Sequence, residues 1–174
     1  MKKILFRATL SIVIVLAYRF KLPNNYYDLI TGLLILSLLI FDLNVNSYPN
    51  DFKNALSYYL SWLVICVSIF PFQGINFSIF SPISLLLFIK LFTLIVYFIK
   101  YKSFCVTKTL LSNIWLGVLA LYFIELCTNS THGFASLCYN FSIFSSIELI
   151  IIAFIKKNRL VYTSSIFNFL WLKK

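Results

Sequence analysis

The sequence predicts an all-α membrane protein with about six transmembrane helices, both termini in the cytoplasm and a short interfacial helix at the C-terminal end. Composition is the first reason: 61% of the 174 residues are hydrophobic and only 11% are charged, whereas soluble domains carry about 25% charged residues. Mean hydropathy is +0.92. The second reason is that no charged side chain occurs from Asn54 to Ile89. Two membrane-spanning helices joined by a loop produce such a stretch, because about 20 apolar residues cross the hydrocarbon core.

Six apolar segments have the length of a membrane span and together form one transmembrane domain, residues 1–157. They are residues 4–20, 26–43, 55–72, 82–99, 109–127 and 135–155. The first segment follows Met1-Lys2-Lys3, as in a signal peptide, but no small-x-small cleavage site follows Ala17, so we interpret it as a retained helix. The loops are short, which predicts that helices consecutive in sequence are neighbours in space.

The distribution of basic residues predicts the orientation. With the N-terminus inside, twelve lysines and arginines lie on the inner side, only Arg19 and Lys21 lie on the outer side, and Lys90 lies within a span. The inner set is Lys2, Lys3, Arg7, Lys53, Lys100, Lys102, Lys108, Lys156, Lys157, Arg159, Lys173 and Lys174. This asymmetry follows the positive-inside rule and favours an even number of spans, because both termini are basic.

Residues 158–174 form a basic, amphipathic tail. Its apolar part covers about 13 residues, which is too short to cross a bilayer. Leu160, Phe167, Leu170 and Trp171 can share one helical face, and Lys173 and Lys174 follow them. An interfacial helix on the cytoplasmic surface fits this pattern.

Two ionisable residues lie at membrane depth. Lys90 is near the middle of the fourth span and Glu148 is in the inner half of the sixth. A charge at the centre of a membrane helix costs about 3 kcal/mol or more, so such residues are candidates for function. Their distances from the inner edge are about 15 Å and about 12 Å at 1.5 Å per residue. We therefore predict that Lys90 and Glu148 pair.

The sixth span carries further polar residues with helical spacing. Cys138, Ser142, Ser145 and Glu148 are four, three and three residues apart, which places them on one face of a helix. We predict a buried polar network of Lys90, Glu148, Ser145 and Ser142. Such a network can fasten helices to one another. Alternatively it can line a proton or ion pathway, and in a third interpretation Lys90 only extends its amine toward the interface.

The cysteines and the single histidine suggest little chemistry. Cys127 and Cys138 flank one outer loop, and a disulfide between them can form in an oxidising compartment if their Cα atoms approach within about 7 Å. His132 lies between them, but three ligands without paired spacing are weak evidence for a metal. No motif of a membrane protease or of a phosphate-binding loop occurs. We therefore expect no catalytic, cofactor-binding or metal-binding residue and no cofactor.

The net charge of +10 does not indicate a nucleic-acid partner, because the basic residues lie at the ends of apolar segments rather than along a polar face. The abundance of residues with AT-rich codons suggests a bacterium with a low-GC genome. We expect a non-enzymatic, multi-pass protein of the cytoplasmic membrane that contacts another membrane protein, a second copy of itself or a membrane-active agent. Accessory and immunity proteins of bacterial defence or toxin systems share this size and architecture. The alternatives are a small transporter or channel subunit, in which Lys90 and Glu148 line the route, and a membrane enzyme acting on lipid or peptide.

Overall fold

The protein is all-helical in a computed structural model that describes residues 2–19, 24–44, 52–69, 82–102, 108–128 and 133–155. The six helices are α1 (Lys2–Arg19), α2 (Asn24–Asn44), α3 (Phe52–Ile69), α4 (Pro82–Tyr101), α5 (Leu110–Cys127) and α6 (Phe134–Ile155). These bounds agree with the six predicted segments to within three residues at each end. The tail, residues 158–174, lies outside the described residues.

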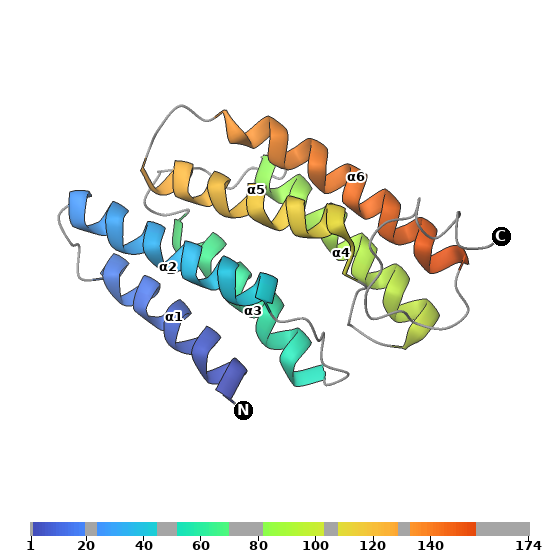
Figure 1. The fold of residues 1–174 in the computed structure, drawn as a ribbon, viewed down its shortest axis with the longest axis horizontal. Helices are drawn as coiled ribbons and strands as arrows, with labels where there is room; N and C mark the ends of the chain where they lie inside the picture. Colours follow the sequence, from blue (N-terminus) through green and yellow to red (C-terminus); the bar gives the residue numbers. More distant parts are fainter. Residues whose placement is uncertain are drawn as a thin grey trace.

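Successive helices alternate in direction and lie roughly side by side (Figure 1). The packed pairs are α1–α2, α1–α3, α2–α5, α3–α5, α5–α6 and α4–α6. Four of these pairs close a ring of α1, α2, α5 and α3, and α6 joins α4 to this ring through α5. The prediction that consecutive helices are neighbours is therefore wrong for much of the bundle. Only α1–α2 and α5–α6 are consecutive among the packed pairs, because side-chain complementarity rather than loop length selects the partners.

Local signals explain where two helices begin and end. Thr109 caps α5: its side chain accepts a hydrogen bond from the Ser112 backbone N–H at 3.0 Å, and Ser112 Oγ accepts one from the Thr109 N–H at 2.9 Å. This reciprocal pattern satisfies donors that a helix start leaves unpaired. At the end of α4, Lys102 adopts a left-handed φ of 51°, and its N–H donates to the Phe98 carbonyl.

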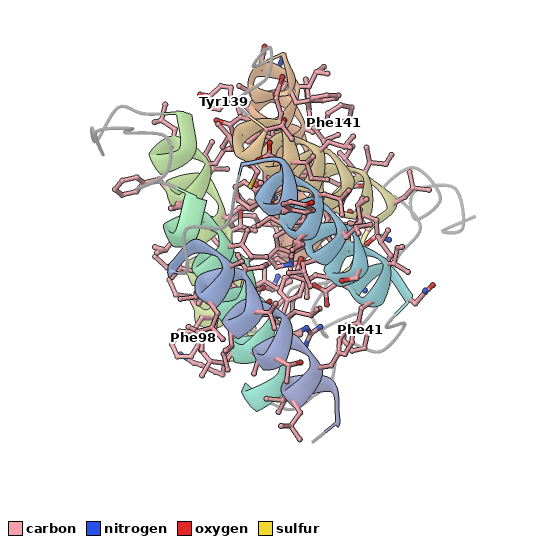
Figure 2. All side chains as sticks on the ribbon, turned by 90° about the vertical axis from the view of Figure 1, so that its left-hand side faces the viewer. Phe41, Phe98, Tyr139 and Phe141 are labelled. Atoms are coloured by element: carbon pink, nitrogen blue, oxygen red, sulfur yellow. The ribbon has the colours of Figure 1, made fainter. Side chains whose placement is uncertain are left out.

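The interior of the bundle contains polar side chains, and its exterior contains large apolar ones. On α2 the buried face is Thr31, Ile35, Leu38 and Asp42, at steps of four, three and four residues. Large hydrophobic side chains are exposed on all six helices, up to 74% for Phe154. Figure 2 shows the side chains filling the space between the helices, with the Phe98 and Phe141 rings toward the outside.

Two helices, α5 and α6, are long and apolar enough to cross a membrane by length and composition. Shorter apolar stretches occur within α1 (Ile4–Ala17) and α3 (Leu56–Cys66). The number of membrane crossings stays a prediction.

Candidate functional site

Two clusters of polar side chains lie between the helices. The first, here called the arginine cluster, consists of Arg7, Asp42, Ser57, Trp62 and Lys108. Arg7 comes from the first turns of α1 and Asp42 from the last turn of α2, whereas Lys108 immediately precedes the cap of α5. These positions share one end of the bundle because successive helices alternate in direction (Figure 1).

The Asp42 carboxylate is the centre of the arginine cluster. Arg7 donates to Asp42 Oδ1 from Nε at 2.9 Å and from Nη2 at 2.6 Å. Trp62 Nε1 donates to the other oxygen, Oδ2, at 3.0 Å. Only 6% of the Arg7 side chain and none of the Asp42 side chain is exposed. Both carboxylate oxygens are thus paired, as a buried ion pair requires if it is not to destabilise the fold.

Further contacts fix the two cations of the arginine cluster. Arg7 Nη1 donates to Ser57 Oγ of α3 at 3.2 Å, and the guanidinium carbon lies 5.5 Å from the ring centroids of Phe41 and Tyr58. Lys108 Nζ donates to the backbone carbonyl of Asp42 at 2.7 Å. A cation at this carbonyl also interacts favourably with the C-terminal end of the α2 dipole. The cluster therefore ties α1, α2, α3 and the start of α5 together.

The second group, here called the lysine cluster, lies among α4, α5 and α6 and consists of Lys90, Trp115, Ser142, Ser145 and Ser146. Lys90 Nζ donates to Ser145 Oγ at 2.7 Å. The same nitrogen lies 3.8 Å from the centroid of the Trp115 ring, which is close enough for a cation–π interaction. Lys90 therefore contacts both α5 and α6, although α4 and α5 are not a packed pair.

Two buried hydroxyls of the lysine cluster have no hydrogen-bond partner among the described residues. They belong to Ser142, which is fully buried, and Ser146, which is 3% exposed. Each lies on the buried face of α6 that carries Ser145. An unpaired buried hydroxyl costs free energy, so this part of the bundle has an unused capacity for hydrogen bonding.

The structure joins two of the four predicted network residues directly and places a third on the same buried face of α6. Lys90 and Ser145 are hydrogen-bonded, and Ser142 is buried one turn before Ser145. Glu148 is half-buried and lies three residues after Ser145. Lys90 donates its hydrogen bond to Ser145, and the Lys90–Glu148 ion pair stays a prediction.

The C-terminal end of α6 is held by side chains of α4. Tyr97 donates to the Leu149 carbonyl at 3.2 Å, and Tyr101 donates to the Ala153 carbonyl at 3.2 Å. Lys100 donates to the carbonyls of Ala153 and Phe154. The donors to Ala153 and Phe154 satisfy carbonyls that the helix end leaves unpaired, and the lysine places positive charge at the negative end of the helix dipole.

Glu125 of α5 caps the start of α6. Its carboxylate oxygens accept hydrogen bonds from the backbone N–H groups of Gly133 at 2.5 Å and Phe134 at 2.9 Å. The side chain is 5% exposed. Negative charge at a helix N-terminus is stabilising, so this residue closes the connection between α5 and α6.

Two cysteines flank this connection. Cys127 and Cys138 are buried free thiols. The disulfide between them stays a prediction. Cys138 lies beside Lys90 and Trp115. His132 lies outside the described residues. Within the described ranges, no three histidine, cysteine, aspartate or glutamate side chains are grouped closely enough to hold a metal ion.

Sequence reasoning missed the arginine cluster. Arg7 and Lys108 count as inner-side charges in the orientation argument, and Asp42 ends the second predicted span. Their shared depth was the available signal, since Arg7 and Asp42 both lie inside predicted spans and near the same membrane edge. A cation and an anion at one depth predict a pair in the same way that Lys90 and Glu148 did.

Comparison with known proteins adds no assignment to this geometry: no family model, no curated protein and no solved structure matches the chain.

Proposed function

We propose that this chain is a six-span protein of a bacterial cytoplasmic membrane, with both termini in the cytoplasm. The distribution of side chains supports this proposal, because the exposed surface of every described helix carries large apolar residues, while Arg7, Asp42, Glu125 and several hydroxyl groups are buried. Lipid is a suitable environment for such a surface. The arginine cluster would lie near the cytoplasmic edge and the lysine cluster near the middle of the bilayer.

The topology is tested by reporter fusions. A fluorescent protein joined after Lys174 should fold and fluoresce, because this reporter matures in the cytoplasm. Alkaline phosphatase joined at the same place should be inactive, because this enzyme is active only outside the cytoplasm. A fusion within the outer loop of residues 73–81 should give the opposite pair of results. An active phosphatase at Lys174 would contradict an even number of spans.

Within this membrane bundle, the proposed role is contact with another membrane protein or a membrane-active agent, without enzymatic chemistry. The observation that favours this role is the lateral face of α4, which packs against α6 alone among the packed helix pairs. Its outer face is broad and apolar. The exposed side chains are Leu85, Leu87, Phe88, Leu91, Phe92, Ile95, Phe98 and Ile99.

Site-specific photocrosslinking in cells tests this role. A photoreactive residue at Phe92, which is 59% exposed, should link to one discrete protein partner, including a second copy of the chain. The matched control is Tyr97 on the same helix, which is fully buried and should link only within the chain. Lipid adducts alone at Phe92 would contradict the contact role.

A second candidate is a small transporter or channel subunit, favoured by the lysine cluster. A cation and unpaired hydroxyls inside a membrane bundle are features of ion and proton pathways. This role predicts proton or potassium flux in vesicles containing the purified protein, and Glu148→Gln should abolish the flux while the protein accumulates normally. A flux that is equal in vesicles with and without the protein would eliminate this candidate.

A further inference from the structure

The lysine cluster has hydrogen-bond donors for which the described residues provide no acceptor. A bound ligand could accept from them. Lys90 uses one of its three N–H groups on Ser145 and faces the Trp115 ring with its charge. The buried hydroxyls of Ser142 and Ser146 have no partner among the described residues and lie on the same face of α6 as Ser145. The Lys90 ammonium and the hydroxyls on this face of α6 are donors that suit a ligand accepting several hydrogen bonds.

The charge of the cluster limits the ligand to a group with one negative charge. Lys90 is its only cation, so one negative charge neutralises it. A phosphate monoester carries nearly two negative charges at neutral pH and would leave the excess buried. A carboxylate carries one, and its two oxygens can accept from different donors. The chemistry of the site therefore favours a carboxylate.

The surroundings of Lys90 indicate how the ligand reaches the site. Lys90 is half-buried, so part of it is exposed. Leu87, Phe88 and Leu91, which flank it in sequence, are large, apolar and exposed. A carboxylate carried on an acyl chain could place its chain along these residues and its charge at Lys90.

From these observations we propose that the lysine cluster binds the carboxylate of a fatty acid, which approaches from the bilayer along α4. The proposal rests on the placement of the bundle in a membrane, and the acyl chain would share Leu87, Phe88 and Leu91 with the protein contact proposed for the outer face of α4. Glu148 brings a negative charge to the same helix and opposes an added carboxylate. Removing that charge by Glu148→Gln should therefore tighten binding.

Binding is measured on the full-length protein in phosphatidylcholine nanodiscs by tryptophan fluorescence, since Trp115 is part of the site. Oleate should change the emission in a saturable way, and methyl oleate, which has the same chain without the charge, should not. Trp115→Phe should lose most of the change, whereas Trp62→Phe should keep it because Trp62 belongs to the arginine cluster. Acetate is the probe for a water-soluble carboxylate. Binding of acetate as tight as that of oleate would overturn the acyl-chain part of the proposal.

Variants separate the site from the rest of the bundle. Lys90→Met should weaken oleate binding by about tenfold or more, the value of a hydrogen bond to a charged group. The matched control is Lys100→Met. It removes a cation from α4 that lies at the C-terminal end of α6, away from the lysine cluster, and it should leave the affinity for oleate unchanged. Ser142→Ala is the milder test, with a loss of roughly three- to tenfold.

Three results would overturn the proposal: no saturable response to oleate, equal binding of methyl oleate, or unchanged affinity in Lys90→Met. Weaker binding in Glu148→Gln would also contradict it. None of these results depends on the reporter fusions, so a failure of the carboxylate site and a failure of the six-span topology are distinguishable.

Discussion

The arginine cluster and the lysine cluster both bury a cation between helices, but they satisfy it differently. Arg7 meets a carboxylate, a serine and two aromatic rings, and both oxygens of its partner Asp42 are paired. Lys90 meets a hydroxyl and one ring, and two buried hydroxyls on the same face of α6 have no partner within the described ranges. A satisfied network of opposite charges stabilises one arrangement of helices. A network with unused donors retains the capacity to bind a ligand.

The largest effect that separates the clusters is expected for Asp42→Asn. This change removes the counter-charge of buried Arg7, and breaking a buried pair in this way costs about 3–5 kcal/mol. The free energy of unfolding, measured by denaturant titration of the detergent-solubilised protein, should fall by that amount.

Asp28→Asn serves as the control for Asp42→Asn, because Asp28 is a half-buried carboxylate near the other end of the same helix. Its loss should stay below about 1 kcal/mol, as for partly exposed charges. Equal losses of unfolding free energy in the two variants would show that the arginine cluster stabilises the fold no more than a partly exposed carboxylate does.

The second comparison removes the cation from each cluster. Arg7→Met leaves Asp42 with Trp62 and Lys108 and should cost about 3 kcal/mol, since an unbalanced buried charge remains. Lys90→Met loses one hydrogen bond and one cation–π contact, but it also removes a charge that is costly to bury, so stability should change by less than about 1 kcal/mol. Thermal unfolding of the two variants under identical conditions measures the difference. A loss in Lys90→Met as large as in Arg7→Met would make the lysine cluster a structural element.

The pattern of apolar segments was sufficient to predict the helices. Apolar stretches of about 20 residues separated by polar loops are typical of membrane-spanning helices and of few other structures. The buried face of α6 was equally predictable, since Cys138, Ser142 and Ser145 follow helical spacing. The packed pairs were not, because which helix meets which depends on side-chain fit over the whole surface. The pairing of Arg7 with Asp42 was not predicted, because the positive-inside rule counts the basic residues on each side of the membrane and ignores their acidic partners.

The pairing predicted from sequence for Lys90 and Glu148 can be tested by a double-mutant cycle. If the two charges interact, Lys90→Met combined with Glu148→Gln should be milder than the sum of the single changes by about 0.5–3 kcal/mol. The readout is again the free energy of unfolding. Strict additivity would leave Ser145 and Trp115 as the groups that hold Lys90 and would assign Glu148 no part in the lysine cluster.

The smallest expected effect concerns two buried serines, one whose hydroxyl is hydrogen-bonded and one whose hydroxyl has no partner in the described part of the chain. Ser61 of α3 is 3% exposed and donates to the Tyr58 carbonyl at 2.8 Å, so Ser61→Ala should cost about 0.5–1.5 kcal/mol. The hydroxyl of Ser142 has no partner among the described residues. Ser142→Ala should therefore leave stability unchanged or raise it slightly, because an unpaired polar atom leaves the interior. Denaturant titration of both variants distinguishes them. If Ser142→Ala destabilises the protein as much as Ser61→Ala does, then that hydroxyl is engaged in the unliganded protein, and the contrast between the two clusters loses its basis.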